Sequence, residues 1–326
     1  MILSYLMKPI YRITSTILNQ VENIARLVGK LEGIYAEKPQ PILRKKNRIR
    51  TIHGSVGIEG NALSEEQVTA LLNGKRIIGP KKDIQEVVNA NQLYETSTQF
   101  NYQSEKDFLK AHKVLMKNLI SHPGSYRAGN VGIFDKSKAI HIAPKANRVA
   151  TLMKELFDFL HQNKNMSLLI QAAIFHYEAE FIHPFMDGNG RMGRFWQHLI
   201  LEQLHPVFRY IPFESMIHQY QKKYYAILQK SDLKGECTDF IGFSLDMILK
   251  TLKEFETEVK PIRLTSESRL DKGKDVFKEH FFSRKEYMNL FNGVGTATAS
   301  RDLLQGVKNK ILEKSGSQAL TKYRYR

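Results

Sequence analysis

The sequence has very little cysteine and no long apolar run. Cys237 is the single cysteine among 326 residues, which excludes an internal disulfide. A lone thiol fits a reducing compartment, so we expect a cytoplasmic protein in which Cys237 is a small buried apolar residue. The most apolar stretch, Phe240–Leu249, is interrupted by Asp246 and is shorter than the roughly 18 residues of a membrane helix. The N-terminal residues lack the pattern of a signal peptide, and we expect no membrane partner.

Internal repeats and low-complexity tracts are also absent, which argues against a solenoid or a disordered chain. Hydrophobic residues make up 42% and charged residues 25%, as in ordinary globular proteins, and the length suffices for two or three domains. Acidic residues are scarce, and the net charge is +16. Such an excess suits nucleic acid, acidic proteins or nucleotides as partners, but a solvated basic surface without a ligand explains it as well.

Residues 183–194, HPFMDGNGRMGR, contain several residue types that can hold a polyphosphate. Gly188 and Gly190 let the main chain approach a ligand closely, and Asn189 tolerates a left-handed conformation. Successive N–H groups in such a turn form an anion-binding concavity. We expect a helix to begin near Arg191, so that its N-terminal amides point at the same place.

The same stretch also carries candidates for catalysis. Arg191 and Arg194 lie three residues apart, so one helix face presents both guanidinium groups to a bound anion. Asp187 offers an oxygen ligand for Mg²⁺, and His183 is suited to act as a general base. Taken singly, a Gly-Asn-Gly is usually a turn and a lone histidine is usually structural; the whole set in order is harder to explain that way.

The stretch resembles the signature of the Fic family, His-x-Phe-x-Asp/Glu-Gly-Asn-Gly-Arg-x-x-Arg, at every defined position. Members mostly transfer the AMP part of ATP to a hydroxyl of a protein. The resemblance implies ATP and Mg²⁺ as cofactors and a hydroxyl-bearing target protein as partner. It implies that His183 deprotonates the hydroxyl, that Asp187 holds the metal and that Phe185 anchors the nucleotide site in the core. The implied phosphate ligands are Gly188, Asn189, Gly190, Arg191 and Arg194.

A second motif lies far upstream. The spacing of Ile49, Ile52 and Val56 predicts a helix, which Gly60–Asn61 ends. Glu59 would then lie at the C-terminal end, where the helix dipole disfavours a negative charge. This position suggests a cationic partner elsewhere, although exposed glutamates near helix ends are common.

Residues 55–60 are similar to the inhibitory Ser/Thr-x-x-x-Glu-Gly/Asn motif of Fic proteins, with Ser55 first and Glu59 fifth. In members with this motif N-terminal to the catalytic domain, the glutamate pairs with the second motif arginine, which is Arg194 here. The resemblance implies that the pair leaves ATP in an unproductive pose. The segment 63–91 also resembles the N-terminal region of this subfamily.

Two weaker candidate regions accompany the motif. Short β-favouring runs at 127–134 and 139–143 around a polar turn predict a hairpin, or else an irregular surface loop. In the Fic family a hairpin here, the flap, covers the nucleotide and binds the target as an added strand, which implies flap contacts by Ile140 and His141.

A pair of tyrosines follows the motif helix. Relatives carry an Asn-Arg pair before two tyrosines in the adenine pocket, which implies adenine contacts by Tyr220 and Tyr224. This chain has Tyr220–Gln221 where the asparagine is expected, and core packing explains the tyrosines equally well. We expect His112 to be structural because it lies on a pattern of core residues, and His176 because no metal-binding His-Glu-x-x-His spacing accompanies it.

Residues 274–326 resemble a winged helix-turn-helix. Ser283 opens a first predicted helix, residues 296–304 form a second, and two short strands follow. In a DNA-binding version one helix would face the groove. A docking or dimerisation domain explains the pattern equally well, and a homodimer stays open. The groove-facing residues would be Thr296, Thr298, Ser300 and Arg301.

We therefore predict a mainly α protein, a Fic-fold helical core with a β-hairpin flap and a C-terminal winged helix-turn-helix domain. The favoured function is protein adenylyltransferase, autoinhibited through Glu59. The alternatives are a Fic enzyme that transfers UMP, phosphate or phosphocholine or removes AMP, and a nucleotide-sensing transcriptional regulator that binds DNA. The predicted parts are an N-terminal helical region (1–46), the Fic N-terminal region with its inhibitory helix (47–100), the catalytic core (101–260), a linker (261–273) and the winged domain (274–326).

Overall fold

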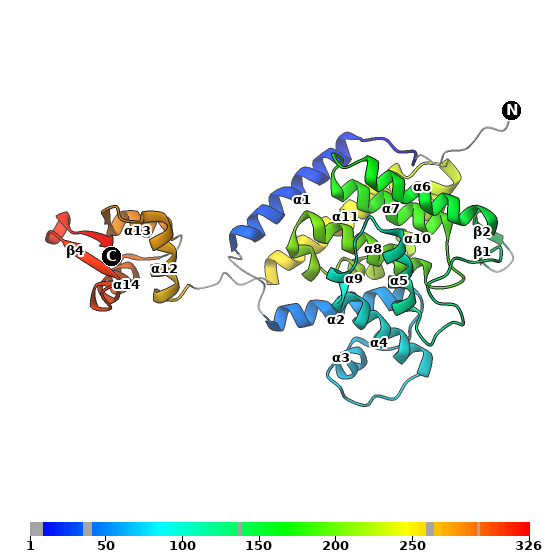
Figure 1. Ribbon diagram of the computed structural model, residues 1–326, viewed down its shortest axis with the longest axis horizontal. Coiled ribbons are helices and arrows are strands. Elements are labelled where there is room, and N and C mark those ends of the chain that lie inside the picture. Colours follow the sequence, from blue (N-terminus) through cyan, green and yellow to red (C-terminus); the bar gives the residue numbers. More distant parts are fainter. Residues whose placement is uncertain (1–8, 35–40, 136–137, 259–263, 292–293) are drawn as a thin grey trace. The chain divides into compact units, whose positions relative to one another are not determined.

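The computed structural model describes residues 9–34, 41–135, 138–258, 264–291 and 294–326. By its internal contacts the chain divides into two compact units, Met1–Lys260 and Pro261–Arg326. Both are built mainly from helices, as predicted (Figure 1). Within these ranges no helix is both long and apolar enough to cross a membrane.

The first unit consists of helices and one short hairpin. Its α-helices are α1 (Ser15–Ile34), α2 (Pro41–Ile58), α3 (Glu65–Leu72), α4 (Lys81–Glu95), α5 (Glu105–Leu115), α6 (Val149–Gln162), α7 (Leu168–Ile182), α8 (Asn189–Leu204), α9 (Phe213–Gln219), α10 (Gln221–Lys234) and α11 (Thr238–Glu258). Three short 3-10 helices join them, η1 (Ser97–Gln99), η2 (Ala146–Arg148) and η3 (Pro206–Tyr210).

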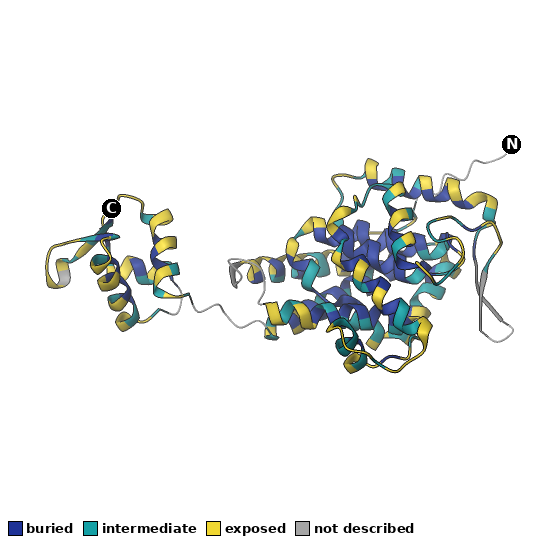
Figure 2. Cartoon of the chain, turned by 60° about the horizontal axis from the view of Figure 1, so that its bottom comes forward, coloured by how far each residue is buried: buried dark blue, intermediate teal, exposed yellow. Residues whose placement is uncertain are grey.

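Helices α7 and α8 form the centre of this unit. Almost every residue of α7 is buried, since the helix is apolar nearly all the way round and can be accommodated only inside the core. Along it packs α8, whose Phe195 and Trp196 are fully buried. Figure 2 shows the buried residues concentrated in the interior of this unit, with exposed ones on the outer faces. The loop between α7 and α8 carries the predicted motif, so that motif is joined to two largely buried helices.

Helix α2 lies against α9, and a glycine permits the close approach. A Cβ at Gly54 would lie 2.6 Å from both the Cα and the N of Ser215. The helix ends at Ile58, two residues before the predicted stop at Gly60–Asn61, and Ser64 then opens α3 with a capping box completed by Gln67. Glu59 therefore follows directly after the last residue of α2.

The predicted hairpin is present. Strand β1 (Gly132–Asp135) pairs antiparallel with β2 (Lys138–Ile142), with Ile133 opposite His141 and an irregularity between Ile133 and Phe134. The side-chain contacts predicted for Ile140 and His141 lie outside the described part of the chain.

The described residues of the second unit form three α-helices, one 3-10 helix and a three-stranded antiparallel sheet in the order β3-β5-β4. Ser283 caps its middle helix with a capping box, as expected. Its core is built from Leu270, Phe282, Tyr287, Phe291, Ala299, Leu303, Leu312 and Tyr325. The elements are α12 (Ser266–Phe277), β3 (Phe282–Ser283), α13 (Arg284–Leu290), α14 (Thr296–Lys308), β4 (Leu312–Ser315), η4 (Gln318–Leu320) and β5 (Lys322–Tyr325).

The prediction of a linker at 261–273 is wrong over most of its length. Helix α12 begins at Ser266, and it buries Leu270 and Gly273 in the second core. Its Arg269 pairs with the buried Asp302 of α14 through two hydrogen bonds, one of them 2.9 Å long from Nη2 to Oδ1. The segment is polar in composition because only a narrow stripe of this helix faces the core.

Candidate active site

The motif loop joins two helices through residues with left-handed backbones. His183 ends α7 with φ 52° and ψ 61°, and Gly188 precedes α8 with φ 86°. Helix α8 begins at Asn189, two residues before the predicted start at Arg191. The first N–H groups of α8, which have no partner within a helix, therefore include those of Asn189 and Gly190, whereas the amide of Gly188 donates to Oδ1 of Asp187. This end of α8 is a site where a dipole and free amides both favour an anion.

His112 supports the motif loop through a hydrogen bond and a ring contact. Its Nδ1 accepts a 2.8 Å hydrogen bond from the amide of Gly124, so its Nε2–H donates to the carbonyl of Asp187 at 3.0 Å. The ring stacks on Phe185 at a centroid distance of 3.5 Å. Burial lowers the pKa of His112 to about 4, so the ring is neutral at physiological pH. The structural role expected for His112 is thus support of the motif loop.

Asn189 and Phe185 form hydrogen bonds with each other inside the loop. The amide of Phe185 donates to Oδ1 of Asn189, and Nδ2 of Asn189 donates back to the carbonyl of Phe185, both at 2.8 Å. Phe185 is fully buried, which suits the anchoring role that the resemblance implied. Both functional groups of the Asn189 side chain are satisfied within the loop, and its main chain is what it can offer to a phosphate.

A buried arginine that we did not predict braces the loop from the other side. Nε of Arg127 donates to the carbonyl of His183 at 2.7 Å, and Nη2 reaches the carbonyl of Ile182 at 3.3 Å. The same guanidinium donates to Gly129 and Pro144, which flank the hairpin. The carbonyls of Ile182 and His183 lie at the C-terminal end of α7, where the helix dipole favours a cation. Arg127 therefore ties the base of the hairpin to the backbone of the candidate base His183.

Arg191 and Asp187 contact each other across the first turn of α8. Nη2 of Arg191 lies 3.0 Å from Oδ1 of Asp187, and Nη1 lies 3.0 Å from Oε1 of Glu86 on α4. The other carboxylate oxygen of Glu86 accepts from Asn61 at 2.8 Å. Arg191 is almost fully buried, whereas the Asp187 side chain is 43% exposed. The Asp187 carboxylate is thus the accessible charged group of this pair.

Arg194 of α8 contacts the C-terminal end of α2. The side chain is fully buried, and its Nη2 donates to Oε1 of Glu59 at 2.6 Å and to the carbonyl of Ser55 at 3.0 Å. The contact that the upstream motif implied is therefore present. Gly190 makes room for it, since a Cβ at that position would collide with the Glu59 carboxylate.

The guanidinium of Arg194 is incompletely satisfied. Although burial works against the charged form, the carboxylate of Glu59 and further anionic neighbours raise the pKa of Arg194. Its Nε and Nη1 are buried, and neither has a hydrogen-bond partner among the atoms the structure describes. The same holds for Nε of Arg191. Unpaired buried donors are costly, so these N–H groups indicate a site that is built for a further acceptor.

Two side chains of α10 hold the end of α2, and sequence reasoning missed both roles. The amide of Gln221 and the hydroxyl of Tyr225 donate to the carbonyl of Ile58 at 2.7 and 3.0 Å. Gln221 is the residue whose neighbourhood departs from the family pattern. Because Glu59 follows Ile58 directly, this contact links the position of Glu59 to α10.

The two predicted adenine residues differ in environment. Tyr224 is buried, and its hydroxyl lies 2.9 Å from Nε2 of His176 and 3.3 Å from Oε1 of Glu180. These contacts agree with the alternative that Tyr224 packs in the core. His176 also contacts Gln197, so it is structural, as expected. Tyr220 is 37% exposed, with the ammonium of Lys250 4.4 Å from its ring centre. Of the two, only Tyr220 is exposed to solvent.

The four candidate DNA contacts all lie on the N-terminal half of α14. Thr296 and Arg301 are exposed, Thr298 and Ser300 are half-buried, and Ser300 accepts a 3.0 Å hydrogen bond from Arg284 of α13. They share one helix but not one uniform exposed face. Their role in DNA binding stays a prediction.

Comparison with known proteins identifies the family. A sequence profile of the Fic/DOC family matches residues 102–201. A Fic family protein from Desulfovibrio desulfuricans has a crystal structure that is 36% identical and covers 98% of each chain with a TM-score of 0.74. Fic-1 from C. elegans shares the fold at 20% identity, with a TM-score of 0.61 over 74% of this chain and 72% of that one.

Curated relatives carry the name protein adenylyltransferase Fic. That of Culex quinquefasciatus is 27% identical over 79% of this chain and 52% of its own length, and that of Aedes aegypti is 28% identical over 64% and 42%. The chain thus spans about half the length, or less, of these relatives. With the motif, its loop geometry and a near full-length structural relative in agreement, the chain belongs to the Fic family.

Proposed function

We propose that this chain is a protein adenylyltransferase that transfers AMP from Mg-ATP to a Ser, Thr or Tyr hydroxyl of a protein. The names of the curated relatives support this reaction class. The observation that carries the proposal for this chain is the state of Arg194. It is fully buried at the N-terminal end of α8, yet two of its nitrogens lack an acceptor within the described structure.

The phosphates would be held by the chain's own positive groups. The free amides at the start of α8 and the unpaired nitrogens of Arg194 and Arg191 are donors that a phosphate could use, and such donors stabilise developing negative charge. Because these groups are fixed by the core, they need little reorganisation during reaction. Positioning and charge stabilisation are expected to supply most of the catalysis in phosphoryl-group chemistry.

His183 would act as the general base. The target oxygen attacks the α-phosphorus in line, its proton passes to the His183 imidazole, and the bond to the departing pyrophosphate breaks. The products are the AMP-modified protein and pyrophosphate. Arg127 fixes the His183 backbone at 2.7 Å, and Nδ1 of the ring lies 3.3 Å from the carbonyl of Glu180.

Mg²⁺ fits the residues present. Asp187 is a partly exposed carboxylate beside the cradle, and Mg²⁺ commonly uses one or two carboxylates together with phosphates and water. A cluster of three or more potential protein ligands is absent from the described residues, which such a site does not need. When bound, the ion would neutralise phosphate charge as pyrophosphate leaves. Asp187 is kept in place by the amide of Gly188 and by Arg191.

We further propose that Glu59 inhibits the enzyme. Its carboxylate occupies the Nη2 donor of Arg194, and it borders Gly190 within the anion cradle. A phosphate entering there would meet a like charge and would lose one arginine donor. Release of α2 from α9 and α10 would expose both groups to ATP.

Incubation with ATP labelled on the α-phosphate tests both proposals. Glu59→Gly should label itself or a partner strongly, wild type weakly, and Glu59→Gly/His183→Ala not at all. Glu65→Gly, at an exposed position of α3, is the control for removal of a nearby carboxylate. Absence of any His183-dependent label in Glu59→Gly would overturn the assignment.

The chemical identity of the label separates the related reactions. Intact mass of a modified target should increase by one AMP. An increase by UMP, phosphate or phosphocholine would reassign the transferred group. Loss of AMP from a premodified target at a higher rate than its addition would assign AMP removal instead.

A further inference from the structure

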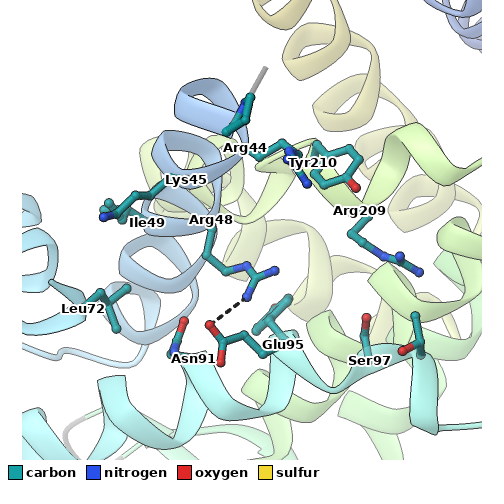
Figure 3. Close-up of a pocket in the computed structure, with 13 residues that line it drawn as sticks. Arg44, Lys45, Arg48, Ile49, Leu72, Asn91, Glu95, Ser97, Arg209 and Tyr210 are labelled. Carbon is teal, nitrogen blue, oxygen red and sulfur yellow. Dashed lines mark ion pairs between the residues drawn. The ribbon is translucent and has the colours of Figure 1, made fainter. Parts of the chain in front are cut away.

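A second basic cavity lies against the other end of the inhibitory helix. It measures about 520 Å³ and opens between α2, α4, η1 and η3 (Figure 3). Volumes of this order accommodate small ligands. The N-terminal half of α2 supplies Arg44, Lys45 and Arg48, and η3 supplies Arg209. None of these residues belongs to the motif loop, so this cavity is separate from the candidate active site.

The charges in this cavity do not balance. Arg48 pairs with Glu95 at 3.4 Å, shown by the dashed line in Figure 3, and Arg209 pairs with Glu202 at 2.8 Å. Arg44 and Lys45 have no carboxylate within 4.0 Å in the part of the chain that the structure describes. Within the described ranges, these two positive charges therefore have no carboxylate partner.

Arg44 also has an unsatisfied donor. Its Nε is buried and makes no hydrogen bond to any described atom, while its guanidinium lies 6.0 Å from the ring centre of Tyr210. Burial is the main cause that lowers the pKa of the neighbouring Arg48, with Glu95 opposing it. Asn91 and the hydroxyls of Ser97 and Thr98 add neutral polar groups to the wall. The cavity thus combines uncompensated charge, desolvation and hydrogen-bonding groups.

We propose that this cavity binds a small anion carrying a phosphate group, and that the anion fastens α2 to η3. A phosphate monoester carries nearly two negative charges at neutral pH, which matches the two cations without partners. Guanidinium groups bind phosphate oxygens through directed N–H bonds. Because Arg44 and Lys45 come from α2 and Arg209 comes from η3, the bound anion would screen their mutual repulsion. This binding proposal does not depend on the transfer reaction proposed above.

Calorimetric titration of the full chain at constant ionic strength tests the site, with inorganic phosphate and AMP as separate probes and no Mg²⁺. Loss of one charge-assisted hydrogen bond lowers affinity by about tenfold or more. Arg44→Gln/Lys45→Gln should therefore weaken binding of the preferred probe by about a hundredfold. Lys46→Gln should leave it unchanged, because Lys46 lies next in the helix but pairs with Glu258 at 3.0 Å outside the cavity.

The outcomes separate the sources of the anion. Equal affinity for both probes, lost in the double variant, assigns a free phosphate; tighter AMP binding, lost in the same way, assigns a nucleotide monophosphate. Binding that is unchanged in the double variant belongs to the candidate active site and overturns the proposal. Absence of saturable binding to wild type overturns it too. Thermal unfolding of each variant without probe verifies that the fold is intact.

Discussion

The side chain of Arg127 donates a 2.7 Å hydrogen bond to the backbone carbonyl of His183. Since the left-handed conformation of His183 costs on the order of 1–2 kcal/mol, the loop depends on outside support. The same guanidinium contacts Gly129 and Pro144 at the two ends of the hairpin segment. The hairpin segment and the motif loop are thus held by one buried cation.

We predict that Arg127 positions the base without contacting substrate. In a Glu59→Gly background, Arg127→Met should lower kcat for labelling far more than it changes the KM for ATP. Each buried carbonyl left without a donor costs about 1 kcal/mol or more, so urea unfolding should show a loss of stability as well. Arg127→Lys, which keeps the charge but not the geometry, should recover part of the stability and less of kcat.

Arg148→Met is the matched control, because this arginine is exposed close to the same segment. It should change neither kcat nor stability. If Arg127→Met lost stability but kept kcat once folded, the positioning role would be disproved and a purely structural one would remain.

The motif loop could be predicted because its residues are contiguous in the sequence. Its supports could not, because they are distant in the chain. Arg127 is 56 positions from His183, and Glu86 is 105 positions from Arg191. Nothing in the local pattern of either residue signals a partner in the loop. Only Glu59 was found at long range: its helix-end position suggested a cation elsewhere, and the resemblance to the inhibitory motif of Fic proteins implied that this cation is Arg194.

Among the helices too, some could be predicted from local sequence and others could not. Apolar spacing predicted α2, because burial on one face leaves a periodic pattern, and a serine marked the start of α13. The polar segment that became α12 left a weak pattern, since its buried side consists mainly of Leu270 and Gly273 with the ion-paired Arg269. The stretch was therefore misassigned to a linker.

Helix α2 should be released by a change that does not touch Glu59. Gly54→Ala places a methyl group 2.6 Å from the backbone of Ser215, which cannot rotate away as a side chain could. Overpacking of this kind typically costs about 1–3 kcal/mol. We expect α2 to move from α9, so that the Glu59–Arg194 contact weakens and labelling with α-labelled ATP increases above wild type.

Gly29→Ala provides the control within another helix of the first unit. A Cβ there meets nothing within 4 Å, and alanine favours a helix by up to about 1 kcal/mol. It should raise the unfolding temperature and leave labelling unchanged. Labelling by Gly54→Ala that stays at the wild-type level, in a protein with lowered stability, would refute the link between α2 packing and inhibition.

Stability should depend on pH through His112. Because burial lowers the pKa of His112 to about 4, the unfolded chain binds a proton below about pH 6.5 while the folded chain does not. The neutral ring therefore contributes stability above the unfolded pKa, and this contribution is lost as the pH falls from about 6.5 to 4, by up to about 1.4 kcal/mol per pH unit. Urea unfolding at several pH values should show that decline.

His112→Gln isolates this effect from other titrating groups. The variant lacks the imidazole, so the difference in unfolding free energy between wild type and variant should shrink as the pH is lowered. A difference that stayed constant between pH 7 and 4 would show that His112 does not titrate in this range.

Helix α14 provides the last test, on the DNA-binding alternative for the second unit. If Arg301 contacts a phosphate, Arg301→Ala should weaken binding of the full chain to duplex DNA and reduce the salt dependence of binding by about one ion. Fluorescence anisotropy at several salt concentrations measures both quantities. Lys272→Ala, exposed on α12, should have no effect on either. Because Leu304 is 70% exposed on the same helix, a docking surface is the competing explanation. Weak DNA binding that Arg301→Ala leaves unchanged would therefore favour protein docking through α14.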